Sequence, residues 1–306
     1  MFILKNLFSI IKNNKYLIIL GLGLTFLFVT LLLPYQDINT YISSQINTYT
    51  NGKVQFTAKK FLISPFMELQ FMDSITSYKK IEVPIKKIAI KPLWLQSLLL
   101  NFGIEVNAHS IFEGNIQLVV KKNKSKKHPL AFNAYLQNIS LEKLPLPFIK
   151  LHGKISANIK TLINPHWLYA PNIYLEVINN KKIQVFRSKI PSPFGPIQIP
   201  LIHFSKLKIK AATQKEVLNI QNLELGSSTD ALYIKIAGTA ALTIKKQRRK
   251  NTLSIKNYKL SVYIKAQQPP PSWKSLLALL DNYKTGNVYQ FHIKGNSLNA
   301  IPELTR

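Results

Sequence analysis

Residues Leu232 to Ile244 read LYIKIAGTAALTI, and apolar and polar side chains alternate along this stretch. One parity holds isoleucine, leucine, alanine and a single glycine, whereas the other holds lysine, threonine, tyrosine and alanine. Successive side chains of a β-strand point to opposite faces of its sheet. The stretch therefore predicts a strand of an antiparallel sheet with one dry and one wet face.

The same alternation recurs along most of the chain, and it predicts a mainly β fold. Two short helices are also expected. The first, at residues 91–103, has proline near its first position and Gly103 at its end. The second, at 272–284, follows three prolines, has Ser272 as its N-cap and is ended by Gly286. The further strands are expected at residues 53–58, 67–72, 86–90, 104–108, 115–120, 130–136, 149–159, 173–177, 183–186, 207–211, 217–225, 260–264 and 288–294.

The apolar parity of the two longest alternations marks a candidate functional face. This face either contacts lipid acyl chains or is buried where the two halves of the sheet and the helices pack on each other. Its members are Ile149, Leu151, Ile155, Ile159, Leu232, Ile234, Ile236, Leu242 and Ile244.

Tyr16 to Leu33, YLIILGLGLTFLFVTLLL, is an uncharged run of eighteen residues. A bilayer core about 30 Å thick needs roughly 20 apolar residues of helix, so the run predicts a transmembrane helix. Lysines precede it, which favours a cytoplasmic N-terminus. A cleaved signal peptide is the alternative, but no small-x-small site follows the run.

A second helix is expected directly after this span, with Ile38, Tyr41, Ile42, Ile46 and Tyr49 on one face. It either lies on the membrane surface or caps the end of the following sheet, and we favour the cap. The expected organisation is a cytoplasmic N-terminus at 1–15, the span at 16–33, the juxtamembrane helix at 34–52, a β-rich half at 53–187, a proline-rich connection at 188–200 and a second β-rich half at 201–306.

Composition narrows the classes of function. The formal net charge is +28 and there is no cysteine. Lysine is spread along the whole chain, so the charge predicts a solvated basic surface; anionic lipid or an acidic partner is the next interpretation, and nucleic acid is not expected. Two basic runs, at residues 121–128 and 245–250, are interpreted as solvated loops between strands.

Catalytic patterns are missing from the sequence. The six histidines are scattered without metal-ligand spacing, and no nucleophile elbow or phosphate-binding glycine loop occurs. The sequence therefore predicts a protein that is not an enzyme, with no metal site and no cofactor.

Several segments resemble known families. Thr50-Asn-Gly-Lys-Val-Gln-Phe56 and Leu62-Ile-Ser-Pro-Phe-Met-Glu-Leu-Gln-Phe-Met-Asp73 resemble the opening of AsmA-like proteins, although Asn51 interrupts the usual Thr-Gly pair. Four other segments resemble the long form of the type II secretion system protein N (GspN) family. They are Leu93 to Leu100, Leu151 to Ala157, Pro200 to Ile209, and Leu223 to Leu242 with Gly226, Asp230 and Gly238.

The GspN resemblance implies a single-pass protein of the bacterial inner membrane with a β-rich periplasmic domain. Its implied role is as a non-enzymatic component of a type II secretion system that contacts other secretion proteins. The AsmA-like resemblance implies an elongated, curved antiparallel sheet with an apolar groove. The alternative function is therefore the binding or transfer of phospholipid, or another anionic lipid, between the inner and outer membranes.

Overall fold

The computed structural model describes residues 20–21, 24, 35–64, 68–78, 81–93, 103–145, 150–179, 181–186, 188–190, 197–199, 201–246, 251–269, 271–297 and 302–306. Of the predicted span at 16–33, only Leu20, Gly21 and Leu24 are among these residues. None of the helices in the described part of the chain has both the length and the apolar character that crossing a bilayer requires.

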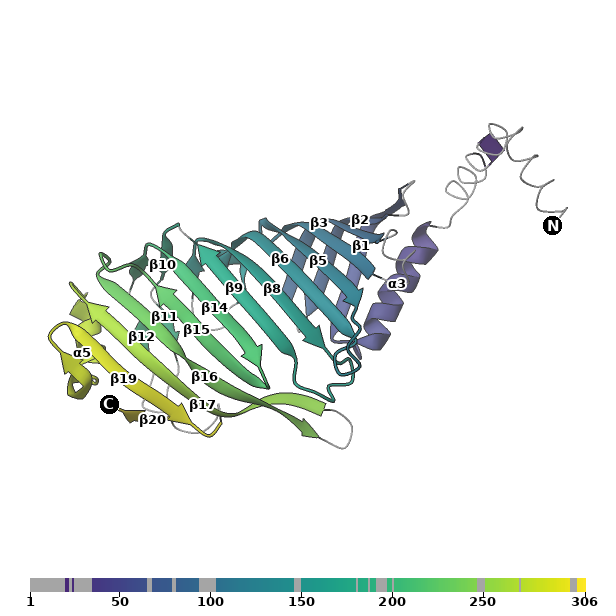
Figure 1. Ribbon diagram of the computed structural model, residues 1–306. Coiled ribbons are helices and arrows are strands. Elements are labelled where there is room, and N and C mark those ends of the chain that lie inside the picture. The colour runs from purple at the N-terminus through teal and green to yellow at the C-terminus, as the bar shows by residue number, and fades with distance from the viewer. Residues whose placement is uncertain are drawn as a thin grey trace.

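One antiparallel sheet of 15 strands dominates the fold, which is mainly β. Figure 1 shows its strands side by side in a long row, with β1 and α3 (Tyr35–Tyr49) at one end and β19 and α5 (Pro271–Ala278) at the other. The strands are β1 (Val54–Ile63), β2 (Leu69–Tyr78), β3 (Ile81–Pro92), β4 (Gly103–Ile111), β5 (Gly114–Lys122), β6 (Leu130–Ser140), β8 (Lys154–Ile163), β9 (Asn172–Asn179), β14 (Leu207–Gln214), β15 (Val217–Leu225), β16 (Leu232–Lys246), β17 (Asn251–Ala266), β18 (Lys284–Thr285), β19 (Val288–Gly295) and β20 (Glu303–Thr305).

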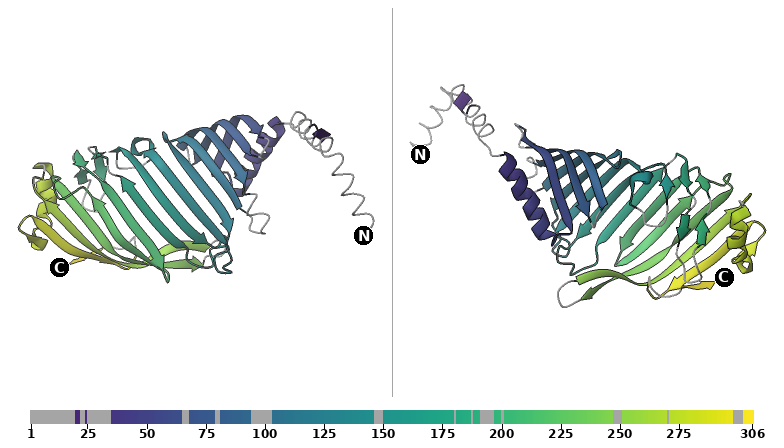
Figure 2. Two further views of the ribbon diagram at one scale, coloured as in Figure 1. Left: turned by 45° about the horizontal axis from the view of Figure 1, so that its top comes forward. Right: turned by 180° about the vertical axis from the view of Figure 1, so that it is seen from behind.

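The strands twist progressively along the row, as the two views of Figure 2 show. From β1 to β6 each strand pairs with the next in the chain, and the order then continues β8, β9, β14, β15, β16, β17, β19, β18. Such a meander follows directly from short connections between alternating segments, because antiparallel neighbours need only a tight turn.

Five short strands leave the main sheet. β7 (Leu151–His152), β10 (Ile183–Val185) and β13 (Ile202–Phe204) form a three-stranded sheet, and β11 (Ser188–Ile190) pairs with β12 (Ile197–Ile199). Across this excursion β9 pairs directly with β14, from Asn179 opposite Leu207 onward. The two predicted β-rich halves are therefore parts of one continuous sheet, and the proline-rich segment is a side excursion.

The helix α3 (Tyr35–Tyr49) caps the N-terminal end of the sheet. Its residues Ile38, Ile42 and Ile46 pack against the cluster of buried phenylalanines in β1 and β2. Tyr41 and Tyr49, which were expected on the same face, are 64% and 84% exposed. Of the two alternatives for this helix, packing on the sheet is the one observed, because the isoleucines face the strands.

At the other end, α5 (Pro271–Ala278) is shorter than the helix predicted at 272–284, since the chain continues as the 3-10 turn η2 (Asp281–Tyr283). Leu277 of α5 packs in a second buried cluster with Leu232 and Tyr289. A further 3-10 turn, η1 (Leu141–Lys143), lies beside β7. The described helices thus pack at the two ends and along one side of the sheet.

Two predicted elements differ from the structure. Lys91 and Pro92 belong to β3 and Gly103 begins β4, so the helix predicted at 91–103 is wrong at both ends, and residues 94–102 lie outside the described part. The strand predicted at 149–159 is broken at Gly153, whose φ of 131° is a conformation that favours glycine. The alternation of side chains continues through this break, which is why the sequence did not reveal it.

The two buried clusters lie at opposite ends of the sheet, under α3 and beside α5. Among the described residues, the buried clusters are therefore two and separate rather than one closed core.

Candidate functional site: two apolar rows across the sheet

Strand register brings apolar residues from thirteen strands into one line across the sheet. Directly opposed residues of an antiparallel pair lie on the same face, so the pairs can be followed from β1 to β19 without a gap. The first apolar row consists of Phe61, Phe71, Ile88, Ala108, Ile116, Leu136, Ala157, Val177, Ile209, Leu223, Ile236, Val262 and Phe291.

A second row runs beside the first on the same face. It is also free of polar side chains and contains one glycine. The second apolar row consists of Ile63, Leu69, Ile90, Val106, Leu118, Ala134, Ile159, Leu175, Ala211, Ile220, Gly238, Leu260 and Ile293.

From β1 to β15 the opposite face of these strands is mainly polar, so the two faces differ in chemistry over this part of the sheet. A row traced through the same pairings there contains mainly amides and charged groups. Its members are Leu62, Gln70, Ala89, Asn107, Gln117, Tyr135, Asn158, Glu176, Lys210 and Asn222.

Burial varies along the first apolar row. At its ends Phe71 is 1% exposed under α3 and Phe291 is 5% exposed near the C-terminal cluster. In the middle, Ile116, Leu136 and Ile209 are only half-buried, although Val177 is buried. Neighbouring strands lie about 4.8 Å apart, so the row is roughly 58 Å long. The arrangement is a long apolar track with covered ends and a more accessible middle.

The predicted site residues are distributed unevenly over this face. Ile159 and Ile236 are members of the rows, and Ile155, two residues from Ala157 in β8, continues the same face. Ile234 packs against the C-terminal buried cluster, of which Leu232 is a member. Leu151 lies in β7, in the separate three-stranded sheet, and Ile149 lies outside the described residues.

Leu242 and Ile244 lie on a projecting arm of the sheet. β16 and β17 continue beyond the end of β15, and Leu242 pairs with Ile255 and Ile244 with Leu253 there. Figure 1 shows this arm extending past the neighbouring strands. Leu242 is buried, and its amide donates a hydrogen bond to the carbonyl oxygen of Glu216.

Sequence reasoning missed most members of the rows, including Ile88, Ile116, Leu136 and Ile209. Each lies in a segment where apolar and polar side chains alternate, so the sequence could predict which residues of its own strand share its face. Which residue of the next strand it opposes depends on turns and bulges, which the alternation does not encode.

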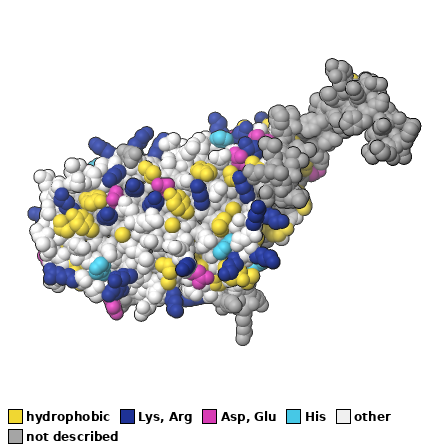
Figure 3. All heavy atoms as spheres, in the orientation of Figure 1, with side chains coloured by type: hydrophobic (Ala, Val, Ile, Leu, Met, Phe, Trp, Pro, Cys, Tyr) yellow, Lys and Arg dark blue, Asp and Glu magenta, His cyan; other side chains and the backbone are white. Residues whose placement is uncertain are grey.

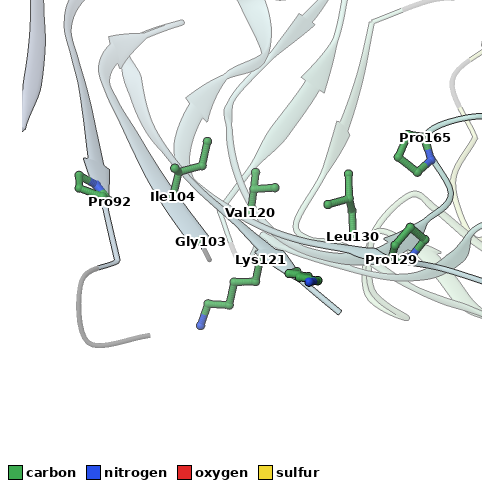
Figure 4. A pocket seen from close by; sticks show the side chains of 9 residues that line it. Pro92, Gly103, Ile104, Val120, Lys121, Pro129, Leu130 and Pro165 are labelled. Carbon is green, nitrogen blue, oxygen red and sulfur yellow. The ribbon is translucent and has the colours of Figure 1, made fainter. Parts of the chain in front are cut away.

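An apolar pocket opens where the rows approach one edge of the sheet. It has a volume of about 610 Å³ and is lined by residues from the ends of β3 to β6. Figure 4 shows Ile104, Val120 and Leu130 pointing to the same side, while Lys121 points the other way. Ile104 is 45% exposed, so apolar surface is accessible at this edge.

Two ion pairs lie away from the apolar rows. Lys91 pairs with Glu105 at 3.3 Å and Lys206 pairs with Glu224 at 3.3 Å. Burial opposes ionisation of Glu105, but hydrogen bonds from Asn107, Gln117 and Lys91 outweigh it and lower its pKa. Figure 3 shows one face of the molecule, with lysine and arginine side chains scattered among few acidic ones.

The carboxylate of Asp230, in the turn between β15 and β16, is hydrogen-bonded within that turn and to the segment between β13 and β14. Its carboxylate accepts hydrogen bonds from the amides of Ser205 (2.8 Å) and Ser227 (3.1 Å) and from the Ser227 hydroxyl (3.1 Å). Burial opposes ionisation, but these bonds outweigh it and lower the pKa of Asp230. The carboxylate thereby ties β13 to the β15–β16 turn.

Among the described residues, no three His, Asp or Glu side chains are grouped as a metal site would require. The apolar rows contain no titratable side chain. The chemistry that they offer is therefore the burial of hydrocarbon against a continuous surface.

Comparison with known proteins gives no match, whether with a protein-family model, a curated protein or a solved structure.

Proposed function

We propose that the protein binds lipid acyl chains along the two apolar rows and thereby holds or transfers lipid. The observation that carries this proposal is the unbroken apolar register across thirteen strands, with a polar row on the opposite face. A sheet that only had to fold would tolerate polar residues on the accessible middle of this face. Here the alternating pattern excludes them from both rows.

The dimensions of the rows suit acyl chains. One leaflet of a bilayer contributes about half of its 30 Å hydrocarbon thickness, so an extended chain spans about 15 Å. A row of about 58 Å therefore accommodates more than three such chains in series. Each buried methylene contributes about 0.8 kcal/mol, so even partial contact along one chain sums to several kcal/mol.

The test is the lipid content of the purified full-length chain, measured by mass spectrometry after gel filtration. The informative variant is Ile159→Asp, which places a carboxylate in the second row at a half-buried position. The matched control is Asn133→Asp on the polar face, opposite Lys160. We expect wild type and the control to retain lipid. The lipid content of the Ile159→Asp variant should be at least tenfold lower than that of wild type.

A lipid-free wild-type chain would refute the proposal. Equal lipid in both variants would also refute it, because lipid bound elsewhere than on the rows does not respond to Ile159. Circular dichroism of each variant establishes that the fold is retained, since an Asp in a closed core would unfold the sheet.

The membrane location is proposed from the sequence. The apolar run at 16–33 would anchor the chain in a bacterial inner membrane with its N-terminus in the cytoplasm, and the sheet would lie in the periplasm. Protease added to spheroplasts should then degrade the sheet and spare the N-terminus. Protection of the whole chain would contradict this topology.

A second candidate function is that of a non-enzymatic component of a type II secretion system, proposed from the GspN resemblance. The position of β1 at one end of the sheet favours it, because among the described strands β1 pairs with β2 alone, while α3 packs beside it and the Asn39 side-chain amide donates to the carbonyl oxygen of Ala58. Such an edge can accept a strand of another protein. Site-specific crosslinking from β1 should capture a secretion-system protein in cells, and an absence of crosslinked partners would count against this role.

A further inference from the structure

Two basic segments, more than 100 residues apart in the chain, lie on one edge of the main sheet. The end of β5 and the β5–β6 connection carry Lys121, Lys122, Lys124, Lys126 and Lys127. The arm formed by β16 and β17 carries Lys245 on its described part. Residues 121–130 and 241–256 contain no Asp or Glu.

Hydrogen bonds connect these segments through the loop between β8 and β9. The Asn251 side-chain amide, on the arm, donates to the carbonyl oxygen of His166 at 3.2 Å. Asn164 in the same loop is 6% exposed, and its side-chain amide donates to the carbonyl oxygen of Lys127 at 3.1 Å. His128 contacts the carbonyl oxygen of Ala170 at 2.8 Å. The arm, the loop and the β5–β6 connection therefore form one edge, which we call the basic rim.

The basic rim adjoins the apolar pocket of Figure 4. Lys122 lies opposite Leu130 in the register, so it shares the face of the apolar rows. Both residues line the pocket, together with Val120 and Ile104. A lysine side chain at the mouth of an apolar cavity places a cation beside hydrocarbon-binding surface, which is the combination that an amphipathic anion requires.

Four lysines of the rim have no carboxylate partner among the described residues. They are Lys122, Lys124, Lys126 and Lys245. All four side chains are exposed. Clustered cations repel each other, and an anionic group bound among them relieves this repulsion.

We infer that the basic rim binds the phosphate of an anionic glycerophospholipid whose acyl chains lie along the apolar rows. This inference rests on the proposed function, because it assigns a headgroup site to the same lipid. The pocket at the rim would admit the first part of the chains, and Lys122 would lie between the headgroup and the hydrocarbon.

The test compares two lipids with identical acyl chains, dioleoyl phosphatidylglycerol and dioleoylglycerol, the second of which lacks the phosphate. Binding to the delipidated full-length chain is measured by native mass spectrometry and by co-elution in gel filtration. The rim variant is K122Q/K124Q/K126Q/K245Q. The control variant K154Q/K181Q/K182Q/K274Q removes the same charge from exposed lysines elsewhere.

We expect wild type and the control variant to bind phosphatidylglycerol at least tenfold more tightly than dioleoylglycerol. Several partly solvated ion pairs between lysine and phosphate would give a difference of this size. The rim variant should lose this preference and bind dioleoylglycerol as wild type does. High salt should reduce the preference of wild type, because exposed charges are screened.

Three results would overturn the inference. Equal binding of the two lipids by wild type would remove the headgroup site while leaving the acyl-chain proposal intact. An equal loss of preference in both variants would show that net charge, rather than the rim, selects the anionic lipid. Binding of neither lipid would refute the proposed function itself, and the inference with it.

Discussion

Truncating an apolar side chain should destabilise the protein more under α3 than in the middle of the rows. Phe71 is 1% exposed, and its ring packs on Phe56 and Phe61 with centroids 5.3 Å and 4.9 Å away. Replacing a buried phenylalanine with alanine leaves a cavity and costs about 3–5 kcal/mol. We therefore expect Phe71→Ala to lower the free energy of unfolding by an amount in this range.

Leu136 provides the comparison from the middle of the first apolar row. It lies between Ile116 and Ala157 in the register and is half-buried. A fully buried leucine loses about 2–5 kcal/mol on truncation. At Leu136 water already reaches the side chain and fills the space left behind, so we expect Leu136→Ala to cost about 1 kcal/mol.

The assay is urea unfolding of the delipidated full-length chain, followed by circular dichroism. Asn133→Ala, on the polar face of the same strand, is the control and should change stability by less than about 0.5 kcal/mol. If Leu136→Ala costs as much as Phe71→Ala, the middle of the sheet is a closed core. The reasoning that leads from the rows to a lipid track would then be wrong.

Three further predictions concern the frame that holds the rows. Asp230→Asn should destabilise the chain by about 1–2 kcal/mol at pH 7 through weaker hydrogen bonds at the β15–β16 turn. The pKa of Asp230 is lowered in the folded state, so its contribution is present above the unfolded pKa of about 3.9 and is lost as pH falls through the lower folded value. In acid unfolding curves, wild type and variant should therefore begin to approach each other only below the unfolded pKa. Gly238 has a φ of 154°, and a Cβ there would clash with the carbonyl oxygen of Lys259. Gly238→Ala should therefore disturb the β16–β17 pairing and speed amide hydrogen exchange in these strands. Unchanged exchange would contradict this prediction. Ile42→Asp should detach α3 from β1 and expose the helix to limited proteolysis, with Tyr41→Asp on its exposed side as the silent control.

The strands and their faces could be predicted from the sequence because alternation of side chains is a local property. The register could not, because it depends on irregular positions. Asp73 has a φ of 48°, and residues Phe56 and Phe61 of the facing strand, which differ in parity, join the same buried cluster. A similar irregularity near Asn138, with φ of 53°, shifts the pairing of β6 with β8. At Asn138 the pairing shifts by one residue, whereas at Asp73 the pairing with β1 and β3 keeps its register and only the parity that is buried changes.

The candidate site, too, was predictable where it depends on local alternation and unpredictable where it depends on contacts between distant segments. Two predicted members, Ile159 and Ile236, lie in the rows because their segments alternate cleanly. The convergence of the basic segments was not predictable, because it depends on hydrogen bonds between residues 85 and 37 positions apart in the chain. Each segment alone has the composition of an ordinary solvated loop.

The pairing order of the main sheet has a consequence for how its length can change. Among the described strands, each of β1 to β5 pairs only with strands directly before or after it in the chain, so this part of the sheet is nearly one-dimensional. Deleting or duplicating one hairpin removes or adds two strands, which preserves both the direction of the chain and the face that each parity occupies. The track would then shorten or lengthen by about 9.6 Å per hairpin. Gain or loss of whole hairpins could therefore change the length of the sheet in evolution, and only the contacts at the inserted or deleted hairpin would have to change.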